Sequence, residues 1–345
     1  LVFSFCLRVR VKKDVRASIW GTGSYLPKKI LTNADLEKIV ETSDEWISTR
    51  TGIKERRIAS AEEFSSFMGA KAAEKAIEAA KISKSQVDCI VFSTAAPDYI
   101  FPSSAALAQA YLGIKEIPAF DCLAACTGFL YGLSIAKAYV ESGMYQCVLV
   151  IAADKLSSFV ASNYQDRNTC VLFGDGGSAC IVGHSRPGAL EISKVNLGAD
   201  GKQGDLLRLP AGGSRCPASQ DTVQNHQHFI TMEGKEVFKH AVARGRMEFA
   251  AKTCITEAGL QEKDIDWLVP HQANERIIDA IAKRFAVKDS RVFKTLAKYG
   301  NTAASSVGIA LDELLRTHDI HVAERLLLVA FGGGLSWGAV ILQQV

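Results

Sequence analysis

The chain carries two copies of one sequence pattern at a constant separation. The segment AKISKSQVDCIVF, from Ala80 to Phe92, resembles AGLQEKDIDWLVP, from Ala258 to Pro270. Both read as a helix end, a polar turn, an Asp and an apolar strand. Further along, CVLVIAA at Cys147 resembles RLLLVAF at Arg325. The members of each pair lie 178 positions apart. One offset shared by two distant segments indicates a duplicated α/β unit.

Each copy predicts strands and helices in alternation. Strands such as CVLVIAA are almost continuously apolar, as expected when both faces of a sheet are covered. Helical segments such as GAKAAEKAIEAAK are rich in Ala, Lys and Glu, which are good helix formers. We therefore expect a layered α/β architecture with helices between and outside two sheets. The copies meet near the loop from Gly183 to Ser193, which predicts one half over residues 15–187 and another over 188–345.

The composition excludes several classes of protein. The chain has 345 residues, enough for a large core, and its net charge of +3 is too small and dispersed to predict a nucleic-acid partner. Its nine cysteines are an odd number without a CxxC pair, which favours a reducing cytoplasm over a disulfide scaffold. No run of about eighteen apolar residues predicts insertion into a membrane. Residues 1–14 are apolar and then basic, the reverse of a secretory signal, and are predicted to be an extra tail.

A cysteine stands where a predicted strand becomes a helix. IPAFD, at residues 117–121, reads as a short apolar strand, and GFLYGLSIAKAYV has helical length and ends near Gly143. Cys126 falls in or next to the first turn of that helix, where free N–H groups and the positive end of the helix dipole favour a thiolate. The position predicts a nucleophile, and a buried structural cysteine is the alternative at this stage.

Polar and glycine-rich segments follow predicted strands and turns in the second copy. His271 comes directly after the strand DWLVP, and loops at strand ends are where α/β proteins bind ligands. Asn301 lies in a Gly-Asn-Thr turn that leads into a helix of small residues. The glycines of FGGGLSWG, from Phe331, let the backbone approach a ligand and direct N–H groups toward it. Each of these features also has a structural alternative. His271 could cap a helix or lie in an interface, and Asn301 could cap the helix that follows it. The glycines could simply form a tight turn.

The sequence predicts no metal site and no phosphate loop. Cys122 and Cys126 have no histidine pair at zinc-ligand spacing. FGDGGSA, from Phe173, lacks the lysine and the regular glycines of a phosphate-binding loop. We therefore expect neither a metal nor an organic cofactor.

Together these motifs resemble the β-ketoacyl-acyl-carrier-protein synthase III family, the initiating condensing enzymes of bacterial-type fatty acid synthesis. The resemblance spans nearly the whole chain after the first dozen or so residues. Its motifs occur in the family's order: TSDEWISTRTGIKERRI, AACTGF, VPHQANERI, YGNTAA and FGGGLSWG. The resemblance implies a thiolase-like fold, with a duplicated five-layer αβαβα architecture and two mixed sheets. It also implies a homodimer.

The family's Cys-His-Asn triad corresponds to Cys126, His271 and Asn301. The resemblance implies that the Cys126 sulfur takes an acyl group from an acyl-CoA primer, with acetyl-CoA as the expected primer. The N–H groups of Cys126 and Gly333 would stabilise the oxyanion. His271 and Asn301 would stabilise the enolate formed when malonyl-acyl carrier protein loses carbon dioxide, and the product would be a β-ketoacyl-carrier protein. Two residues before the Asn, this chain has Tyr299 where the family has a histidine.

The resemblance also implies binding residues. The positions that the family uses to bind CoA correspond to Trp46, Arg50 and Arg167. The position that closes the primer pocket across the dimer interface corresponds to Phe101. The positions that bind acyl carrier protein correspond to Lys239, Arg276, Lys283 and Arg284. A solvated surface is the alternative for the basic side chains. Ordinary packing is the alternative for the two aromatic ones.

Two other functions remain open on these grounds. A specialised enzyme of the same fold would use the same triad on another acyl chain in secondary metabolism. A non-catalytic module that binds acyl-CoA or carrier protein would be expected to lack part of the triad, and all three residues are present. We therefore expect a cytoplasmic acyltransferase.

Overall fold

The computed structural model describes residues 15–160, 166–285 and 287–345, so the predicted tail at residues 1–14 lies outside the described part. Within these residues, nine strands form one hydrogen-bonded sheet with the order β11-β12-β13-β8-β1-β7-β6-β4-β5. In chain order the strands are β1 (Ala17–Tyr25), β4 (Cys89–Ser93), β5 (Ala119–Cys122), β6 (Cys147–Asp154), β7 (Gly176–His184), β8 (Leu190–Ala199), β11 (Trp267–Pro270), β12 (Arg325–Gly332) and β13 (Ser336–Gln344).

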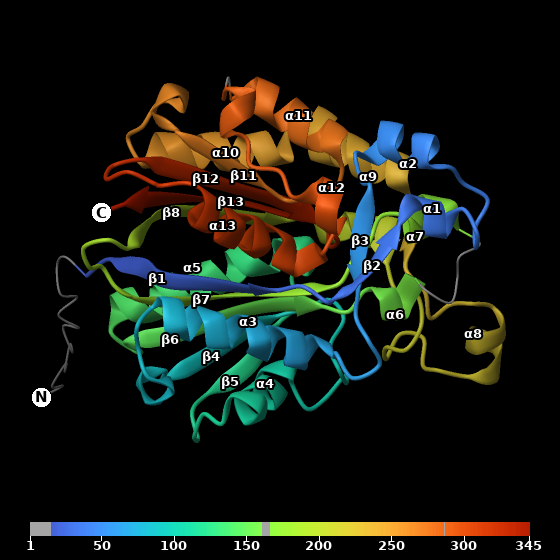
Figure 1. Ribbon diagram of the computed structural model, residues 1–345, viewed down its shortest axis with the longest axis horizontal. Helices are drawn as coiled ribbons and strands as arrows, with labels where there is room; N and C mark the ends of the chain where they lie inside the picture. The colour runs from blue at the N-terminus through green and yellow to red at the C-terminus, as the bar shows by residue number, and fades with distance from the viewer. Residues whose placement is uncertain (1–14, 161–165, 286) are drawn as a thin grey trace, which may run out of the picture.

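Long helices cover the strands in three layers, which gives the expected five-layer αβαβα arrangement (Figure 1). The outer layer on one side contains α3 (Ser65–Ala79) and α4 (Ser104–Leu112). The middle layer contains α5 (Gly128–Ser142) and α13 (Ser306–Thr317). The outer layer on the other side contains α10 (Arg246–Glu257) and α11 (Glu275–Arg284). The helix predicted to end near Gly143 does so, because Gly143 adopts φ 76° directly after α5.

The two expected sheets are joined at one point. β8 and β1 pair through Ser18 with Glu191 and Ile19 with Leu190. The register of β1 against β7 then shifts between Ile19 and Gly21. Beyond this seam the sheet divides into a part β1-β7-β6-β4-β5 and a part β8-β13-β12-β11, which lie on either side of the middle helices (Figure 1). Both parts are mixed, because each combines parallel and antiparallel pairs.

The offset of the sequence repeat continues through the structure. The first residues of β4 and β11 lie 178 positions apart, and so do those of β6 and β12. The strand order β1-β7-β6-β4 in the first copy corresponds to β8-β13-β12-β11 in the second. An isolated bridge between Leu268 and Val292 stands where a counterpart of β5 would complete the second copy. The division at residue 187, between β7 and β8, stays a prediction.

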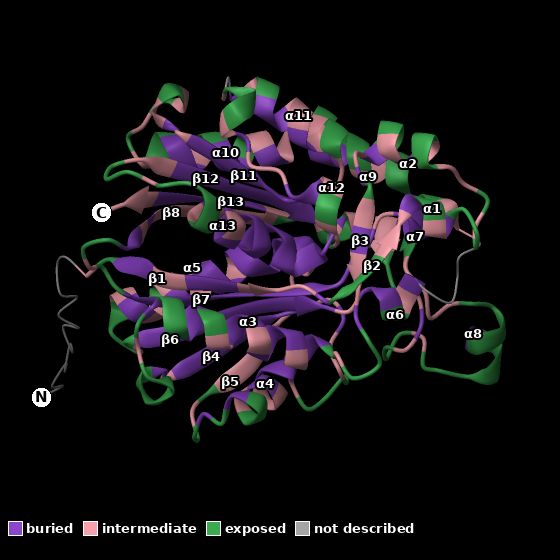
Figure 2. Cartoon of the chain, viewed as in Figure 1, coloured by how far each residue is buried: buried purple, intermediate pink, exposed green. Residues whose placement is uncertain are grey.

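Side chains of the central strands alternate between two cores. In β6, Val148 and Val150 pack with the middle helices, whereas Leu149 and Ile151 pack with α3. The side chains of β12 alternate in the same way between the middle helices and α10. Figure 2 shows the strands and the middle helices buried and the outward faces of the outer helices exposed. Coverage on both faces therefore explains why these strands are continuously apolar.

Most of the shorter elements gather at one end of the sheet (Figure 1). They are β2 (Lys29–Thr32), β3 (Glu55–Ile58), α1 (Asn33–Leu36), α2 (Asp44–Thr51), α6 (Ser157–Val160), α7 (Arg167–Cys170), α8 (Gln220–Gln224), α9 (Gly234–Phe238) and α12 (Leu296–Tyr299), with β9 (Leu207–Arg208) and β10 (Thr231–Met232) forming a further pair. In the described part of the chain, no helix has both the length and the apolar character needed to cross a membrane.

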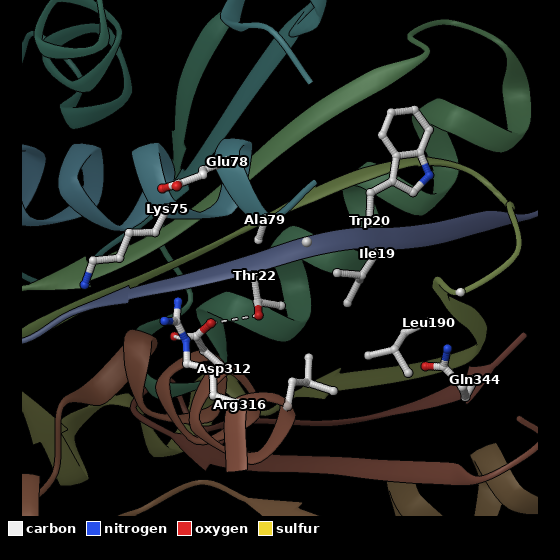
Figure 3. A pocket seen from close by; sticks show the side chains of 13 residues that line it. Ile19, Trp20, Thr22, Lys75, Glu78, Ala79, Leu190, Asp312, Arg316 and Gln344 are labelled. Atoms are coloured by element: carbon white, nitrogen blue, oxygen red, sulfur yellow. Dashed lines mark hydrogen bonds and ion pairs between the residues drawn. The ribbon is translucent and has the colours of Figure 1, made fainter. Parts of the chain in front are cut away.

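Asp312 on α13 connects the two copies near the seam. Its buried carboxylate accepts hydrogen bonds from the hydroxyl groups of Thr22 at 2.8 Å and Ser24 at 2.6 Å, both on β1. Figure 3 shows the Thr22–Asp312 bond in a cleft where α3, β1 and α13 meet. Arg316 Nε donates to the same carboxylate at 3.0 Å. A charged group of the second copy thus receives hydrogen bonds mainly from the first.

Replacing Asp312 with alanine is expected to lower the free energy of unfolding by about 2–4 kcal/mol, because the buried hydroxyl of Thr22 and the half-buried hydroxyl of Ser24 lose their acceptor. Urea unfolding followed by circular dichroism measures this change. Asp319→Ala is the matched control, because Asp319 is exposed and lies beyond the end of the same helix. Equal stability of the two variants would show that the Asp312 contacts contribute little.

Candidate active site

One cavity of about 610 Å³ takes residues from both copies of the repeat. Cys126 from the first copy and His271 and Asn301 from the second all line it. All three side chains are nearly buried, with exposed fractions of 6%, 4% and 6%. The tertiary structure therefore places the three candidate residues in one cavity.

Cys126 lies in a sharp turn between a strand and a helix. β5 ends at Cys122, the turn η2 covers Ala125–Thr127, and α5 begins at Gly128. Ala125 adopts φ 43°, a left-handed conformation that non-glycine residues rarely adopt. A Cβ at Gly128 would lie 2.8 Å from the Cβ of Ser93, so only glycine lets the helix start this close to β4. The predicted junction of strand, turn and helix is thus present.

The free thiol of Cys126 is protonated at neutral pH. Burial raises the pKa of Cys126 to about 12, and the charge of Asp154 adds to the increase. The backbone N–H groups of Cys126 and Gly333 act in the opposite direction, because they hydrogen-bond to the sulfur. The helix start therefore favours a thiolate, as expected, but in the free protein the desolvation of the sulfur outweighs this effect on its pKa.

A glycine turn between β12 and β13 covers Cys126. A Cβ at Gly332 would lie 2.7 Å from the Cβ of Cys126, so a side chain at this position would collide with the nucleophile turn. Thr127 Oγ1 and Ser336 Oγ lie 2.9 Å apart, and Ser336 Oγ donates to the carbonyl of Gly333 at 3.0 Å. These contacts hold the two turns together and keep two N–H groups directed at one sulfur.

His271 follows β11, and its backbone N–H donates to the carbonyl of Val329 at 2.7 Å. Its Nδ1 lies 2.5 Å from Ser306 Oγ. Burial lowers the pKa of His271 to about 4, so the imidazole is neutral at neutral pH. A neutral ring that is held at one nitrogen can offer the other to a ligand in the cavity.

Asn301 has its side-chain oxygen occupied. Oδ1 accepts the N–H of Ala303 at 2.9 Å, and the backbone N–H of Asn301 donates to the carbonyl of Leu172 at 2.8 Å. The amide nitrogen of Asn301 has no hydrogen-bond partner among the described residues. The turn-capping interpretation and the catalytic one therefore apply to different atoms of the same side chain.

Two buried residues that hold this site were not found by sequence reasoning. Asp154 accepts hydrogen bonds from the loop after β4 through one oxygen and from Ala304 N–H, at 2.8 Å, through the other. Gln272 accepts from the N–H groups of Thr295 and Leu296 and donates to the carbonyl of Pro270. Each connects segments that are distant in sequence, so no local pattern indicates them.

The repeat offset identifies one hydrogen-bond partner of Asp154, Ala304, as the counterpart of Cys126. The turn η7 (Ala303–Ser305) lies 178 positions from η2, and Ala303 adopts φ 44°, almost the value of Ala125. Ala304 is thus the counterpart of Cys126. The second copy keeps the shape of the nucleophile turn without its sulfur, and its N–H is bound by Asp154.

The predicted CoA-binding residues lie where the cavity reaches the surface, because Arg50, which lines it, is exposed. Trp46 and Arg50 line it, and the guanidinium carbons of Arg50 and Arg167 lie 4.5 Å and 4.8 Å from the centre of the Trp46 ring. Arg167 also donates to the carbonyl of Glu41 at 3.1 Å. The indole therefore already has two cationic neighbours.

Phe101 does not line this cavity in its own chain. Its side chain is 83% exposed, and its chain neighbours Tyr99 and Ile100 are exposed as well. Tyr299 also lies away from the cavity lining, because its hydroxyl donates to Glu313 at 2.8 Å.

The predicted carrier-protein residues lie on or near α11. Arg276 is exposed and donates to the carbonyl of Thr49 at 3.0 Å, while Lys283 is exposed on the same helix. Arg284 pairs with Glu248. Lys239 follows α9 and lies 3.4 Å from a carboxylate oxygen of Glu236. Two of these four cations are therefore partly neutralised by acidic neighbours.

Comparison with known proteins gives consistent matches over both copies. Residues 120–201 match the family described as 3-oxoacyl-[acyl-carrier-protein (ACP)] synthase III, and residues 255–344 match its C-terminal domain. The β-ketoacyl-[acyl-carrier-protein] synthase III of Chlamydia trachomatis serovar D is 98% identical over 331 residues, covering 96% of this chain and 100% of that protein.

Solved structures give the same result for the fold. The crystal structure of 3-oxoacyl-[acyl-carrier-protein] synthase III from Aquifex aeolicus VF5 is 43% identical with a TM-score of 0.85, covering 95% of this chain and 99% of that one. The priming β-ketosynthase from the R1128 polyketide biosynthetic pathway is 35% identical with a TM-score of 0.86, covering 95% and 96%. The duplicated fold, the family motifs and these similarities agree. The chain belongs to the β-ketoacyl-acyl-carrier-protein synthase III family of condensing acyltransferases.

Proposed function

We propose that this protein condenses an acyl-CoA primer with malonyl-acyl carrier protein and so starts fatty acid synthesis, with acetyl-CoA as the expected primer. The observation that carries the proposal is the meeting of Cys126, His271 and Asn301 in one cavity that is open to solvent at the Trp46 end. A nucleophile and two N–H donors are what a decarboxylative condensation requires.

In the first step, the Cys126 sulfur attacks the carbonyl carbon of the acyl-CoA. The N–H groups of Cys126 and Gly333 stabilise the oxyanion of the tetrahedral intermediate. The bond to the CoA sulfur then breaks, and CoA leaves as a thiol with the proton that Cys126 has lost. Because burial keeps the free thiol protonated, we infer that this proton is transferred only when acyl-CoA occupies the cavity.

In the second step, the thioester oxygen of malonyl-acyl carrier protein accepts hydrogen bonds from His271 Nε2 and the Asn301 amide. The bond to the carboxylate breaks, carbon dioxide leaves, and the electron pair moves into an enolate that both donors stabilise. The carbanion attacks the carbonyl carbon of acyl-Cys126. The sulfur is released and takes up a proton, and a β-ketoacyl-carrier protein leaves.

CoA is proposed to bind at the cavity mouth. The adenine base stacks between Trp46 and Arg167, and Arg50 pairs with the phosphates. Because Arg167 lies 4.8 Å from the Trp46 ring centre, its guanidinium has to move outward to admit the base. The expected loss of that cation–π contact is offset by stacking on the nucleotide.

The acidic carrier protein is proposed to bind the basic residues on and near α11: Lys239, Arg276, Lys283 and Arg284. Arg276→Glu is expected to raise the KM for malonyl-acyl carrier protein about tenfold or more and to leave acylation by acyl-CoA within a factor of about two, because it reverses a charge at the docking surface. Lys263→Glu is the matched control, since Lys263 is exposed at the opposite end of β11. An equal effect of both reversals would remove Arg276 from the docking surface.

The exposed apolar segment Tyr99–Phe101 is proposed to lie in the interface of a homodimer. Phe101 then closes the primer pocket of the other subunit, which accounts for a large exposed side chain that its own cavity does not use. Primer length would depend on how deeply this side chain enters.

The specialised alternative, a same-fold enzyme for another acyl chain, is less well supported. The TM-scores for the Aquifex synthase and the R1128 ketosynthase are nearly equal, at 0.85 and 0.86, so the backbone does not separate the two functions. The 98% identity to a β-ketoacyl-acyl-carrier-protein synthase III favours the initiating condensation.

A single-turnover assay tests the proposal. The protein is mixed with a panel of acyl-CoAs, the acyl group on Cys126 is detected by intact mass, and malonyl-acyl carrier protein is then added. Acylation by at least one short acyl-CoA, followed by a β-ketoacyl product, supports the proposal. An unmodified Cys126 with every acyl-CoA would contradict it.

We further infer that the reaction uses no metal or organic cofactor, because thioester leaving groups and N–H donors supply the chemistry. A cytoplasmic location is also proposed. It is supported by the cysteines of the described residues, all of which are free thiols.

A further inference from the structure

The imidazole of His271 carries one proton when neutral, and that proton resides on either Nδ1 or Nε2. The two tautomers have opposite functions in the cavity: with the proton on Nε2 the ring donates a hydrogen bond, and without it the ring acts as a base. The contact that decides between them is the one between Nδ1 and Ser306 Oγ, at 2.5 Å.

Ser306 is the first residue of α13 and is 1% exposed. Its hydroxyl has one hydrogen and, among the described residues, His271 Nδ1 as its one hydrogen-bond partner. A serine hydroxyl in a helix can otherwise donate to a backbone carbonyl about one turn earlier in the chain. Among the described residues, Ser306 Oγ makes no hydrogen bond to the carbonyl of Thr302, which accepts the hydroxyl of Ser305 at 2.8 Å. The Ser306 proton therefore has the Nδ1 lone pair as its acceptor.

We propose that Ser306 is a positioning residue that donates its hydroxyl proton to His271 Nδ1, fixes the Nε2–H tautomer and directs that N–H into the cavity. The proton on Nε2 makes His271 a hydrogen-bond donor to the malonyl thioester oxygen. It also means that His271 is not the base that deprotonates Cys126. This consequence for catalysis rests on the proposed function, whereas the tautomer itself does not.

The same turn orients the second donor. Ala303 N–H holds Asn301 Oδ1 at 2.9 Å, so the amide nitrogen is the atom left to donate, and Ser306 follows η7 directly. In the first copy, 178 positions earlier, the residue equivalent to Ser306 is Gly128. The second copy of the nucleophile turn has thus acquired a hydroxyl and orients the two donors that face Cys126.

Nitrogen-15 NMR of the full-length protein labelled at histidine tests the tautomer directly. The His271 signals are assigned by their loss in His271→Gln. In the unmodified protein we expect a protonated Nε2 and an unprotonated, hydrogen-bonded Nδ1. In Ser306→Ala we expect the Nδ1 signal to lose its hydrogen-bond shift and the two tautomers to mix. A protonated Nδ1 in the unmodified protein would overturn the proposal.

Kinetics test the consequence for the reaction. Ser306→Ala is expected to slow the decarboxylation of malonyl-acyl carrier protein about 10- to 100-fold, the range found when the outer hydrogen-bond partner of a functional histidine is removed at metal sites. The acylation of Cys126, followed by intact mass, is expected to stay unchanged. Ser305→Ala is the matched control, since Ser305 is an equally buried neighbour whose hydroxyl reaches a carbonyl instead of the histidine.

The outcomes separate this inference from the proposed function. Decarboxylation by Ser306→Ala at the rate of the unmodified protein, or an equal loss in Ser305→Ala, refutes the positioning role. Equal losses in acylation and decarboxylation also refute it, because they indicate general damage to the site. Failure of the unmodified protein to condense any substrate refutes the proposed function, and the NMR result then still decides the tautomer.

Discussion

Replacing Cys126 with alanine is expected to abolish transfer of the acyl group from acyl-CoA, with a loss of about ten-thousand-fold or more. Among the described residues that line the cavity, the Cys126 sulfur is the nucleophile that lies against the N–H groups of its own residue and of Gly333. Without the sulfur, the covalent thioester cannot form, and the condensation that consumes this thioester cannot follow. Single-turnover acylation read by intact mass is the measurement.

The fold of this variant is expected to persist. Alanine fills most of the volume of the cysteine and suits a turn that already contains Ala124 and Ala125. Circular dichroism and the thermal midpoint check this point. Cys122→Ala is the matched control, because Cys122 lies four residues earlier, at the end of β5, and does not line the cavity. If the Cys126→Ala variant still formed a stable acyl adduct, or if the Cys122→Ala variant formed none, the wrong sulfur would have been assigned.

Replacing His271 or Asn301 with alanine is expected to slow decarboxylation of malonyl-acyl carrier protein about 100- to 1,000-fold, because each removes one hydrogen bond to the developing enolate. Acylation of Cys126 should change only about threefold or less, since the oxyanion of that step is bound by backbone N–H groups. Release of carbon dioxide and acylation are measured separately in each variant.

His321→Ala provides the control, because His321 is an exposed histidine after α13. Burial lowers the pKa of His271 to about 4, so the imidazole is neutral at pH values well above 4. The decarboxylation rate of the unmodified protein should therefore show no step from His271 over the neutral pH range. A larger loss in acylation than in decarboxylation would reverse the assigned roles.

Much of the fold was predictable because it depends on short-range patterns. Continuous apolar runs indicated strands covered on both faces, and these are β6 and β12. The repeat offset predicted two similar units, and their strand orders correspond. The joining of the two sheets was not predictable, since it depends on β1 and β8, which pair across more than 170 residues of chain through two residue pairs.

The candidate site shows the same division. The turn that holds Cys126 follows from small residues between a strand and a helix, and these local preferences act within a few residues. The protonation of Cys126 does not follow from them, because it depends on burial by segments from the other copy and on the charge of Asp154. The contact between His271 and Ser306 likewise joins residues 35 positions apart.

The sequence alone determined the duplicated α/β plan, the family and the three residue types that carry the chemistry. These depend on periodicity, on glycine and on motifs that are each contained in one short segment. The tertiary structure decided which atoms of those residues are free to react. Burial sets the resting protonation of the thiol, Ser306 occupies one imidazole nitrogen, and Ala303 occupies the Asn301 oxygen. Hydrogen bonding and desolvation act through space, so only the folded chain brings these partners into contact.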